Sequence, residues 1–229
     1  YYDAESVAYR ERFFHDPLFA GLDLDGKDVA DLACGSGVTS LAIRRRFPGA
    51  RTFGFDLSEQ ACADYEVKVG RPAFVADLTR TVDVGRTFDA AIVIGGLHHC
   101  VADLPRTFAN IRSLLRPGGL LLMMEPSDDF LLAGLRRLWY RVDHYFEAET
   151  ERALSHDDIL ATAGPGWSLV DVRHLGGPAY FLILNSLVFR VPRAMKRALA
   201  PPLGAIEAVY NRLPGKLPFA CFVARWRRD

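Results

Sequence analysis

Short apolar runs alternate with longer amphipathic stretches over most of this chain. Five of these runs have the length of buried strands, and each is followed by a pattern with helical spacing. They lie at 29–33, 51–56, 72–76, 88–94 and 119–125. Strands that alternate with helices predict a parallel sheet with helices on both faces. An aromatic, amphipathic stretch at 2–14 predicts one further helix before the first strand.

The last part of the chain predicts a different ending for the sheet. A helix is expected to begin after Ser155, which would be its N-cap. The stretches 167–174 and 219–226 predict a closing antiparallel strand pair, and 176–218 predicts a helical insertion between these strands. Within the insertion, the apolar run 179–189 has 11 residues, too few for a bilayer core that needs ~20. This run is expected to pack on the protein or to lie on a surface.

Together these elements predict an α/β fold: a doubly wound, Rossmann-like sheet of seven strands that is mostly parallel and ends in an antiparallel hairpin. A chain of 229 residues, half of them hydrophobic, can bury a substantial core within one domain. Residues 1–229 are therefore expected to form a single domain. Its predicted parts are an N-terminal helical cover at 1–27, a core at 28–175 and 219–229, and the insertion at 176–218.

The formal net charge of zero conceals a strong asymmetry along the chain. From residue 173 onward, ten Lys and Arg face only two acidic residues, a net charge of +8, so the rest of the chain carries −8. Such a basic tail predicts an acidic partner: a phospholipid surface, a phosphorylated substrate, or the protein's own acidic face. If the insertion is helical, its apolar face would lie beside a cationic rim. This rim would be formed by Arg190, Arg193, Lys196 and Arg197.

Cysteine usage and the first residues of the chain predict a cytoplasmic location. The four cysteines lack the paired spacing of a zinc site or a disulfide framework, so a reducing compartment is expected. The first residues also lack the apolar segment of a signal peptide. Peripheral contact with the inner face of the membrane, through 176–218, stays open as an alternative.

The most informative segment joins the first predicted strand to the helix that follows it. Here Asp31 precedes Gly35 and Gly37, which let the backbone turn tightly and approach a ligand. A carboxylate in this turn would repel a pyrophosphate, so Asp31 favours a cationic or amine-bearing ligand. Asp56 closes the second strand, where it can accept both hydroxyls of a ribose. Asp77 closes the third strand, where it can accept from an adenine amino group or cap the following turn.

These segments resemble the class I S-adenosylmethionine-dependent methyltransferases, in the broad small-molecule branch that includes the ubiquinone-type enzymes. The likeness covers roughly residues 1–126. The family usually has a glycine where this chain has Ala33, which is small enough to keep the turn. The motifs that carry the resemblance are Asp31-Leu-Ala-Cys-Gly-Ser-Gly37, Gly54-Phe-Asp56-Leu-Ser58, Ala76-Asp77-Leu78, the stretch 88–99, and Leu115-Arg-Pro-Gly-Gly119, which resembles the family's break before its fifth strand.

The resemblance implies S-adenosylmethionine as the cofactor and places Asp31 near its methionine amine, directly or through water. The N-terminal helix would cover the cofactor, with Tyr2 or Tyr9 over the methionine end, and the variable region after the fifth strand would build the acceptor pocket. Core packing is the alternative role for these aromatic residues. The expected cofactor contacts are Asp31, Ala33, Cys34, Gly35, Gly37, Asp56, Leu57, Asp77, Leu78, Gly95 and Tyr9. The expected substrate contacts are Glu125, Tyr140, His144 and Tyr2.

Two adjacent histidines follow the fourth predicted strand, where the resemblance would place the transferable methyl group. An imidazole can remove a proton from a hydroxyl or phenol as the methyl group transfers. His99 and His98 are therefore candidates for a general base or a substrate contact, and a structural role is the alternative. No metal site is expected, since adjacent side chains diverge and no carboxylate cluster accompanies the pair.

On this resemblance we expect an enzyme that transfers the S-methyl group by in-line displacement to oxygen or nitrogen of a small molecule, including an amphiphilic or acidic one. An NAD-dependent oxidoreductase and a non-catalytic cofactor-binding or membrane-associated protein are the alternatives. Ser40 stands where the dinucleotide fingerprint has glycine or alanine, which argues against NAD. Nucleic acid is not expected as an acceptor, because the cofactor half is acidic and lacks an Asn-Pro-Pro-Tyr-like motif. The oligomeric state stays open.

Overall fold

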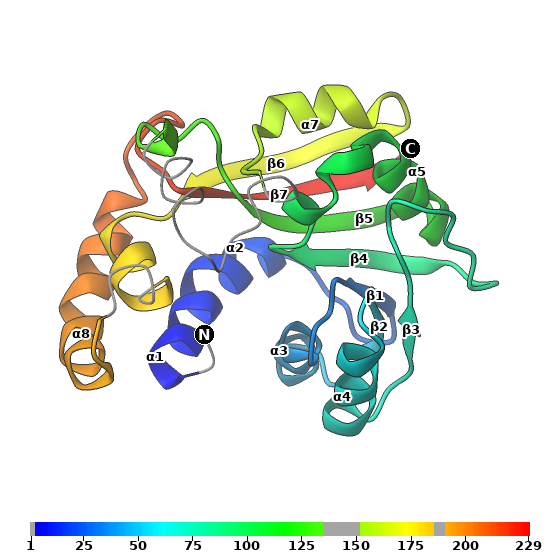
Figure 1. Ribbon diagram of the computed structural model, residues 1–229, viewed down its shortest axis with the longest axis horizontal. Helices are drawn as coiled ribbons and strands as arrows, with labels where there is room; N and C mark the ends of the chain where they lie inside the picture. Colours follow the sequence, from blue (N-terminus) through cyan, green and yellow to red (C-terminus); the bar gives the residue numbers. More distant parts are fainter. Residues whose placement is uncertain (1–2, 135–151, 186–190) are drawn as a thin grey trace.

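The computed structural model describes residues 3–134, 152–185 and 191–229. One sheet of seven strands runs through it in the order β3-β2-β1-β4-β5-β7-β6, and β7 is antiparallel to both of its neighbours (Figure 1). The predicted fold class is confirmed. The strands are β1 (Asp28–Leu32), β2 (Arg51–Asp56), β3 (Ala73–Val75), β4 (Phe88–Ile94), β5 (Leu115–Pro126), β6 (Trp167–Leu175) and β7 (Cys221–Arg228).

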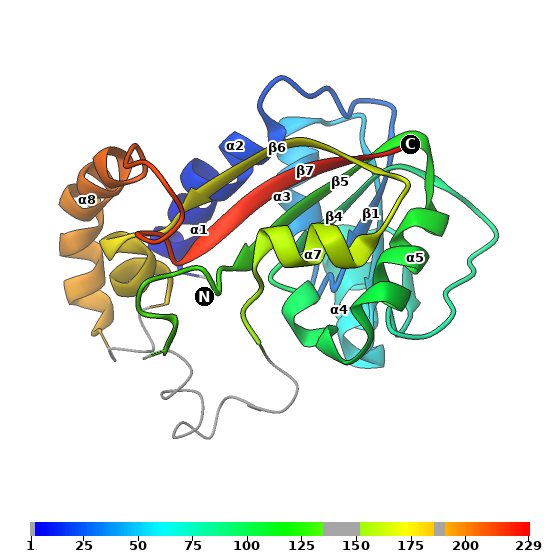
Figure 2. The same ribbon diagram turned by 90° about the horizontal axis from the view of Figure 1, so that it is seen from above.

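Helices cover both faces of the sheet (Figure 2). The α-helices are α1 (Ala4–Arg10), α2 (Asp16–Phe19), α3 (Val38–Arg46), α4 (Glu59–Val69), α5 (Leu104–Leu114), α7 (His156–Ala163) and α8 (Arg193–Tyr210). Short 3-10 helices are η2 (Leu97–His99) and η3 (Val101–Asp103), and π-helical turns are η1 (Glu11–His15) and η4 (Tyr180–Leu184).

The two faces of β1 show how the strand joins two hydrophobic cores. All five residues of this strand are buried, and successive side chains point to opposite faces. Val29 packs in the cluster that contains Phe14 and Ile43, whereas Ala30 packs in the cluster that contains Phe108 and Trp226. A strand that is covered on both faces needs apolar residues at every position, which explains its continuous apolar run.

The N-terminal helical segment is longer than predicted. It begins at Ala4, where the Asp3 side chain accepts from Ser6 N, and helical structure continues to Phe19 rather than ending at residue 14. A π-helical turn, in which Asp16 N donates to Glu11 O, precedes Pro17. Pro17 has no N–H and cannot donate the regular helix hydrogen bond. The wider spacing of the π-helical turn makes that bond unnecessary at this position, so helical structure continues through Pro17.

Three further local predictions are corrected by the structure. Residues 76–87, after β3, form no helix. Strand β5 begins at Leu115, before the Pro-Gly-Gly break, because Leu115 already pairs with Phe88 of β4. After a register shift, regular pairing of β4 with β5 continues from Ala90 and Leu120. Ser155 occupies the N-cap position of α7, but its hydroxyl makes no capping bond and instead lies 3.5 Å from Asp129 Oδ2.

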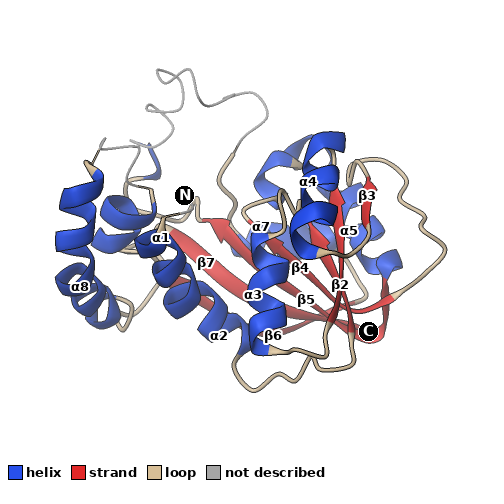
Figure 3. Cartoon of the chain, turned by 90° about the horizontal axis from the view of Figure 1, so that it is seen from below, coloured by secondary structure: helices blue, strands red, loops and turns tan. Residues whose placement is uncertain are grey.

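The connection between β6 and β7 carries η4 and α8. Leu175 at the end of β6 and Pro126 at the end of β5 both pair with Cys221, the first residue of β7. The connection therefore leaves and rejoins the sheet at the edge where the parallel strands end. It lies beside α1 at one end of the molecule (Figures 1 and 3). In the part of the chain that the structure describes, no helix combines the length and the apolar character needed to cross a membrane.

Much of the basic tail is paired with the protein's own carboxylates. Lys196 is only 2% exposed, and its Nζ lies 2.6 Å from both Asp3 Oδ2 and Ser6 Oγ. Arg197 pairs with Glu5 at 3.4 Å. The predicted cationic rim is therefore wrong at Lys196, which is buried against the N-terminal helix, whereas Arg197 is exposed and keeps its acidic partner at the surface. Three further tail cations have acidic partners: Lys216 pairs with Asp157, and Arg173 and Arg225 pair with Asp171. Arg190 lies outside the described residues.

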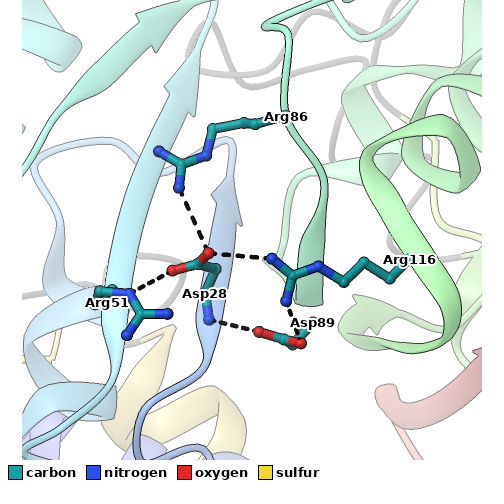
Figure 4. Close-up of polar contacts among 5 residues, drawn as sticks. All are labelled: Asp28, Arg51, Arg86, Asp89 and Arg116. Carbon is teal, nitrogen blue, oxygen red and sulfur yellow. Dashed lines mark hydrogen bonds and ion pairs between the residues drawn. The ribbon is translucent and has the colours of Figure 1, made fainter.

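A cluster of charges at the opposite, amino edge of the sheet ties four strands together (Figure 4). Asp28 is nearly buried, and its carboxylate pairs with Arg51 at 2.6 Å, Arg116 at 3.3 Å and Arg86 at 3.5 Å. Asp28 N also donates to Asp89 Oδ2 at 2.8 Å, and Arg116 pairs with Asp89. One carboxylate thus balances three guanidinium groups from separate strands and from the loop before β4.

Replacing Asp28 with alanine is expected to lower the free energy of unfolding by about 1–3 kcal/mol, because it leaves three guanidinium groups without their shared anion. The arginines are partly exposed, so water offsets part of the loss. Urea unfolding followed by circular dichroism would measure the change. Arg173→Ala is the control, since this exposed residue lies 3.8 Å from its partner. Equal stability of the two variants would contradict a structural role for the cluster.

Candidate functional site

The turn between β1 and α3 has the backbone geometry that its glycines predict. Gly35 and Gly37 have φ angles of 49° and 85°, and a Cβ at Gly37 would lie 2.2 Å from Val69 Cγ2. Ala33 shares the left-handed conformation, with a φ of 51°, at a cost of roughly 1–2 kcal/mol for a residue with a Cβ. Cys34 N donates to Phe55 O at 3.0 Å, which ties the turn to β2.

Asp31 lies beneath this turn and is 2% exposed. Its Oδ2 accepts from Ser40 N at 3.0 Å and from Ser40 Oγ at 2.7 Å, and Ser40 Oγ lies 2.8 Å from Tyr65 OH. Burial raises the pKa of Asp31 to about 7, although the hydrogen bonds from Ser40 oppose the shift. Its other carboxylate oxygen has no donor among the described residues. The geometry therefore leaves one acceptor for a charged group of a ligand.

Asp56 joins the end of β2 to the same turn. Its Oδ2 accepts from Gly35 N at 2.8 Å, and its Oδ1 accepts from Ser58 N at 3.0 Å. Each carboxylate oxygen can accept more than one hydrogen bond, so capacity remains for ribose hydroxyls. Ser58 also caps α4 by accepting from Ala61 N, as its position predicts. The carboxylate thus holds the turn, and its ribose contact stays a prediction.

Asp77 makes the capping contacts that were its alternative role. Its Oδ1 accepts from Thr79 N at 2.9 Å and from Thr79 Oγ1 at 2.6 Å, and Arg80 lies 3.3 Å from Oδ2. The hydrogen bond from the Thr79 hydroxyl lowers the pKa of Asp77. Its adenine contact stays a prediction. Of the two neighbouring leucines, Leu78 is buried and Leu57 is exposed.

The loop after β4 is held from below by Glu125, which is fully buried at the end of β5. Its Oε1 accepts from Gly96 N at 2.9 Å and from Leu97 N at 2.7 Å. Its Oε2 lies 2.8 Å from His98 Nδ1 and accepts from His98 N at 3.3 Å. The structure corrects the expected substrate contact at Glu125, because both oxygens are committed to the loop and to one histidine ring.

The two histidines have different environments. His98 is partly buried and His99 is exposed, with their ring centroids 4.0 Å apart. An ionised carboxylate only accepts hydrogen bonds, so the contact with Glu125 places a proton on His98 Nδ1. In the neutral ring with this tautomer, Nε2 is the unprotonated nitrogen. This arrangement favours His98 over His99 as a proton acceptor.

The loop after β4, residues 95–100, is called the histidine loop, and the turn at 33–37 between β1 and α3 is called the cofactor turn after its predicted role. The two pack directly on each other. A Cβ built at Gly96 would lie 2.7 Å from Ala33 Cβ, so only glycine permits this approach. Gly95 N donates to Met124 O at 2.7 Å, which fixes the loop to β5. Strands β1 and β4 are parallel neighbours, and their ends bring the two segments together. Among the residues that the structure describes, no three or more His, Cys, Asp or Glu side chains form a group that could hold a metal ion.

Tyr9 lies away from this turn, in the contact between α1 and α8. It is buried, and its hydroxyl donates to Oε1 of Glu207, which is itself fully buried. Glu207 also accepts from Gly177 N at 2.8 Å and from Ala179 N at 2.9 Å. The structure thus corrects the expectation that Tyr9 closes over the cofactor, because a buried carboxylate takes its hydroxyl. Tyr2, Tyr140 and His144 lie outside the described residues.

Several structurally important residues are missing from the predicted site. Ser40 holds Asp31, Tyr65 contacts the Ser40 hydroxyl, and neither role has a local sequence signal. For Lys196 and Glu207, the sequence contains a pattern that could have identified them. They stand 11 residues apart, close to three helical turns, so two charges share one face of an amphipathic helix. Charged residues on a buried face require partners.

Comparison with known sequences gives matches to methyltransferases. A family described as a methyltransferase domain matches residues 29–119. A malonyl-[acyl-carrier protein] O-methyltransferase from Xylella fastidiosa (strain M23) is 26% identical over 238 residues, which covers 98% of this chain and 75% of that protein. A trans-aconitate 2-methyltransferase from Methylobacterium radiotolerans is 32% identical over 115 residues, or 48% of this chain and 43% of that protein. The chain thus spans three quarters of one relative and under half of the other.

The fold is also similar to solved methyltransferase structures. The N-methyltransferase NodS from Bradyrhizobium japonicum WM9, in complex with S-adenosyl-L-homocysteine, matches 96% of this chain and 87% of its own, with a TM-score of 0.58. The sequence identity is 14%, so this likeness concerns the fold alone.

Proposed function

Since this chain is a class I S-adenosylmethionine-dependent methyltransferase, we propose that it methylates oxygen or nitrogen of a small or amphiphilic molecule, with His98 as general base. The observation that carries the proposal is the contact of His98 Nδ1 with buried Glu125, in a loop packed on the cofactor turn. S-adenosylmethionine is the cofactor. The turn at Asp31 and Asp56 is the part of the chain that would hold it.

The proposed reaction requires little covalent chemistry from the protein. S-adenosylmethionine supplies an activated methyl group, and the protein aligns the acceptor in line with it. When the acceptor is a hydroxyl, its proton passes to Nε2 of His98. Glu125 then stabilises the imidazolium from the other side of the ring, as a buried carboxylate does in a catalytic triad.

The relatives support a small, acidic or acyl-bearing acceptor. One is named for malonyl-[acyl-carrier protein] and for transfer to oxygen, and the other for trans-aconitate. Both named acceptors contain carboxyl groups. A carboxylate has no proton to lose at neutral pH, whereas a hydroxyl or phenol does. Whether turnover depends on His98 therefore distinguishes a carboxylate acceptor from a hydroxyl or phenol acceptor.

The test is a screen with methyl-labelled S-adenosylmethionine against matched hydroxyl, phenol, amine and carboxylate compounds, with the product identified by mass. We expect labelled product from at least one class, and a rise in melting temperature with S-adenosylhomocysteine but not with NAD. Stabilisation by S-adenosylhomocysteine without any labelled product would favour the non-catalytic alternative. Full transfer by His98→Ala to a hydroxyl would overturn the assigned base.

The raised pKa of Asp31 predicts that cofactor binding depends on pH. Only the ionised carboxylate attracts the methionine amine, so affinity for S-adenosylhomocysteine should fall as the pH drops below about 7, by up to tenfold per pH unit. In the unliganded protein, the folding stability changes with pH in the opposite direction. A raised carboxyl pKa opposes folding in the ionised form, so this contribution to stability is lost as pH rises from about 4 to about 7.

Calorimetric titrations between about pH 5.5 and pH 8.5, in buffers with different ionisation enthalpies, would measure both affinity and proton release. Asp31→Asn is the control, because it keeps an acceptor for Ser40 but cannot ionise. We expect weak binding that is independent of pH in this variant. If wild-type affinity were equally flat over the range, Asp31 would not be paired with the amine.

A further inference from the structure

A cavity of about 370 Å³ lies between α1, η4 and α8, within the size range of small-molecule sites, roughly 300–1,000 Å³. Buried Tyr9, Phe13 and Ile183 contribute apolar surface at its floor. Small residues of the two facing helices, Ala8 and Gly204, line its walls. This groove is apart from the cofactor turn and from the histidine loop, since it includes no residue of either.

Two buried polar links hold the helices on either side of the groove. Lys196 binds Asp3 near the start of α8, and Glu207 binds Tyr9 three helical turns later. Removing Asp3 would leave the buried Lys196 charge without its anion, and removing Tyr9 would take a donor from the buried Glu207 carboxylate, so both links resist rearrangement. The gap between α1 and α8 is therefore maintained by fixed contacts at two points.

The charges at the groove favour an anion. Arg197 is paired with Glu5 at 3.4 Å. Arg12 is exposed and lies over the Phe13 ring at 5.1 Å, with no carboxylate partner among the described residues. A Cβ at Gly204 would lie 3.6 Å from Arg12 Nη1, so this guanidinium borders the cavity. The three charged residues together give a net charge of +1 beside an apolar floor.

We propose that this groove binds an aliphatic carboxylate, with its chain on the apolar floor and its head group at Arg12. Apolar burial supplies non-directional attraction, and a guanidinium offers paired donors that match a carboxylate. A cationic amphiphile would be repelled by Arg12, and a neutral one would leave it without a partner. The site goes beyond the proposed methyl transfer, because neither the cofactor nor His98 takes part.

The direct test uses decanoate, with decan-1-ol and decyltrimethylammonium as neutral and cationic probes of the same chain length, below their aggregation concentrations. Displacement of a fluorescent fatty acid from the full chain would report binding. We expect decanoate to bind at least about tenfold more tightly than either other probe. Absence of decanoate binding, or equal binding of the cation, would overturn the proposal.

Two variants locate the site. Gly204→Leu should reduce decanoate binding at least about tenfold by filling the groove, whereas exposed Ala205→Leu on the same helix should not. Arg12→Gln, at an exposed position, should bring decanoate to the affinity of decan-1-ol. S-adenosylhomocysteine affinity should stay unchanged in all three, which separates this proposal from the proposed function. Unchanged decanoate affinity in folded Arg12→Gln would overturn the proposal, even if Gly204→Leu failed to fold.

Discussion

His98→Ala is expected to lower turnover on a hydroxyl acceptor by ~10²- to 10⁴-fold while S-adenosylhomocysteine binds as tightly as before. The reason lies in the contact of His98 Nδ1 with Glu125, which leaves Nε2 as the nitrogen that can take a proton. Initial rates with labelled cofactor would measure turnover, and calorimetry would measure affinity. Added imidazole should restore part of the lost rate, since it replaces the missing base.

His99→Ala is the matched control for this experiment. His99 is exposed on the same loop, with its ring tilted against that of His98, so its loss should reduce turnover less than about tenfold. Glu125→Gln should also reduce turnover, because its amide group would face backbone donors of the loop. Imidazole should not rescue that variant, whose base is present but misplaced. Full turnover by both histidine variants on a hydroxyl would mean that alignment alone drives the transfer.

The strands and the cofactor turn could be predicted because their signals are local. Apolar runs marked the buried strands, and Gly35 and Gly37 have the positive φ angles that their type allows. Asp56 was also predictable as the residue that closes β2. Its bond to Gly35 N crosses 21 residues, yet both partners belong to one strand-helix-strand unit of regular geometry.

The partners of buried charged residues could not be predicted in the same way. Lys196 and Asp3 are 193 residues apart, and a charge count cannot say which acidic group a cation will meet. The basic tail left a lipid, a phosphorylated substrate and the protein's own carboxylates open. The structure pairs five of its cations internally. Such pairings depend on tertiary packing, which a local pattern does not encode.

The burial of the site residues could not be predicted from the sequence, for the same reason. Asp31 and Glu125 were both recognised as strand-end carboxylates, but their partners come from other elements. Ser40 holds Asp31 from α3, and the loop after β4 surrounds Glu125. A strand end predicts where a carboxylate stands along the chain. Its exposure depends on which helix or loop packs over it.

Asp56→Ala is expected to weaken S-adenosylhomocysteine binding by about 10- to 100-fold without unfolding the protein, because charge-assisted hydrogen bonds contribute roughly 1.5–3 kcal/mol. The variant removes the expected acceptor of the ribose hydroxyls and also the bond that holds Gly35 N at 2.8 Å. Calorimetry would measure the affinity, and circular dichroism would confirm the fold. Asp64→Ala is the control, since this carboxylate lies on α4 and accepts only from Gln60 in the described contacts.

Adenosine and 2′-deoxyadenosine can separate the two roles of Asp56. If the carboxylate binds the ribose, the wild-type protein should prefer adenosine by about tenfold, and Asp56→Ala should lose that preference. If Asp56 acts only by holding the turn at Gly35, the variant should bind both nucleosides more weakly by the same factor and keep the preference. Unchanged affinity for S-adenosylhomocysteine in a folded Asp56→Ala would exclude both roles, and the cofactor would then have to be held by other residues at the end of β2.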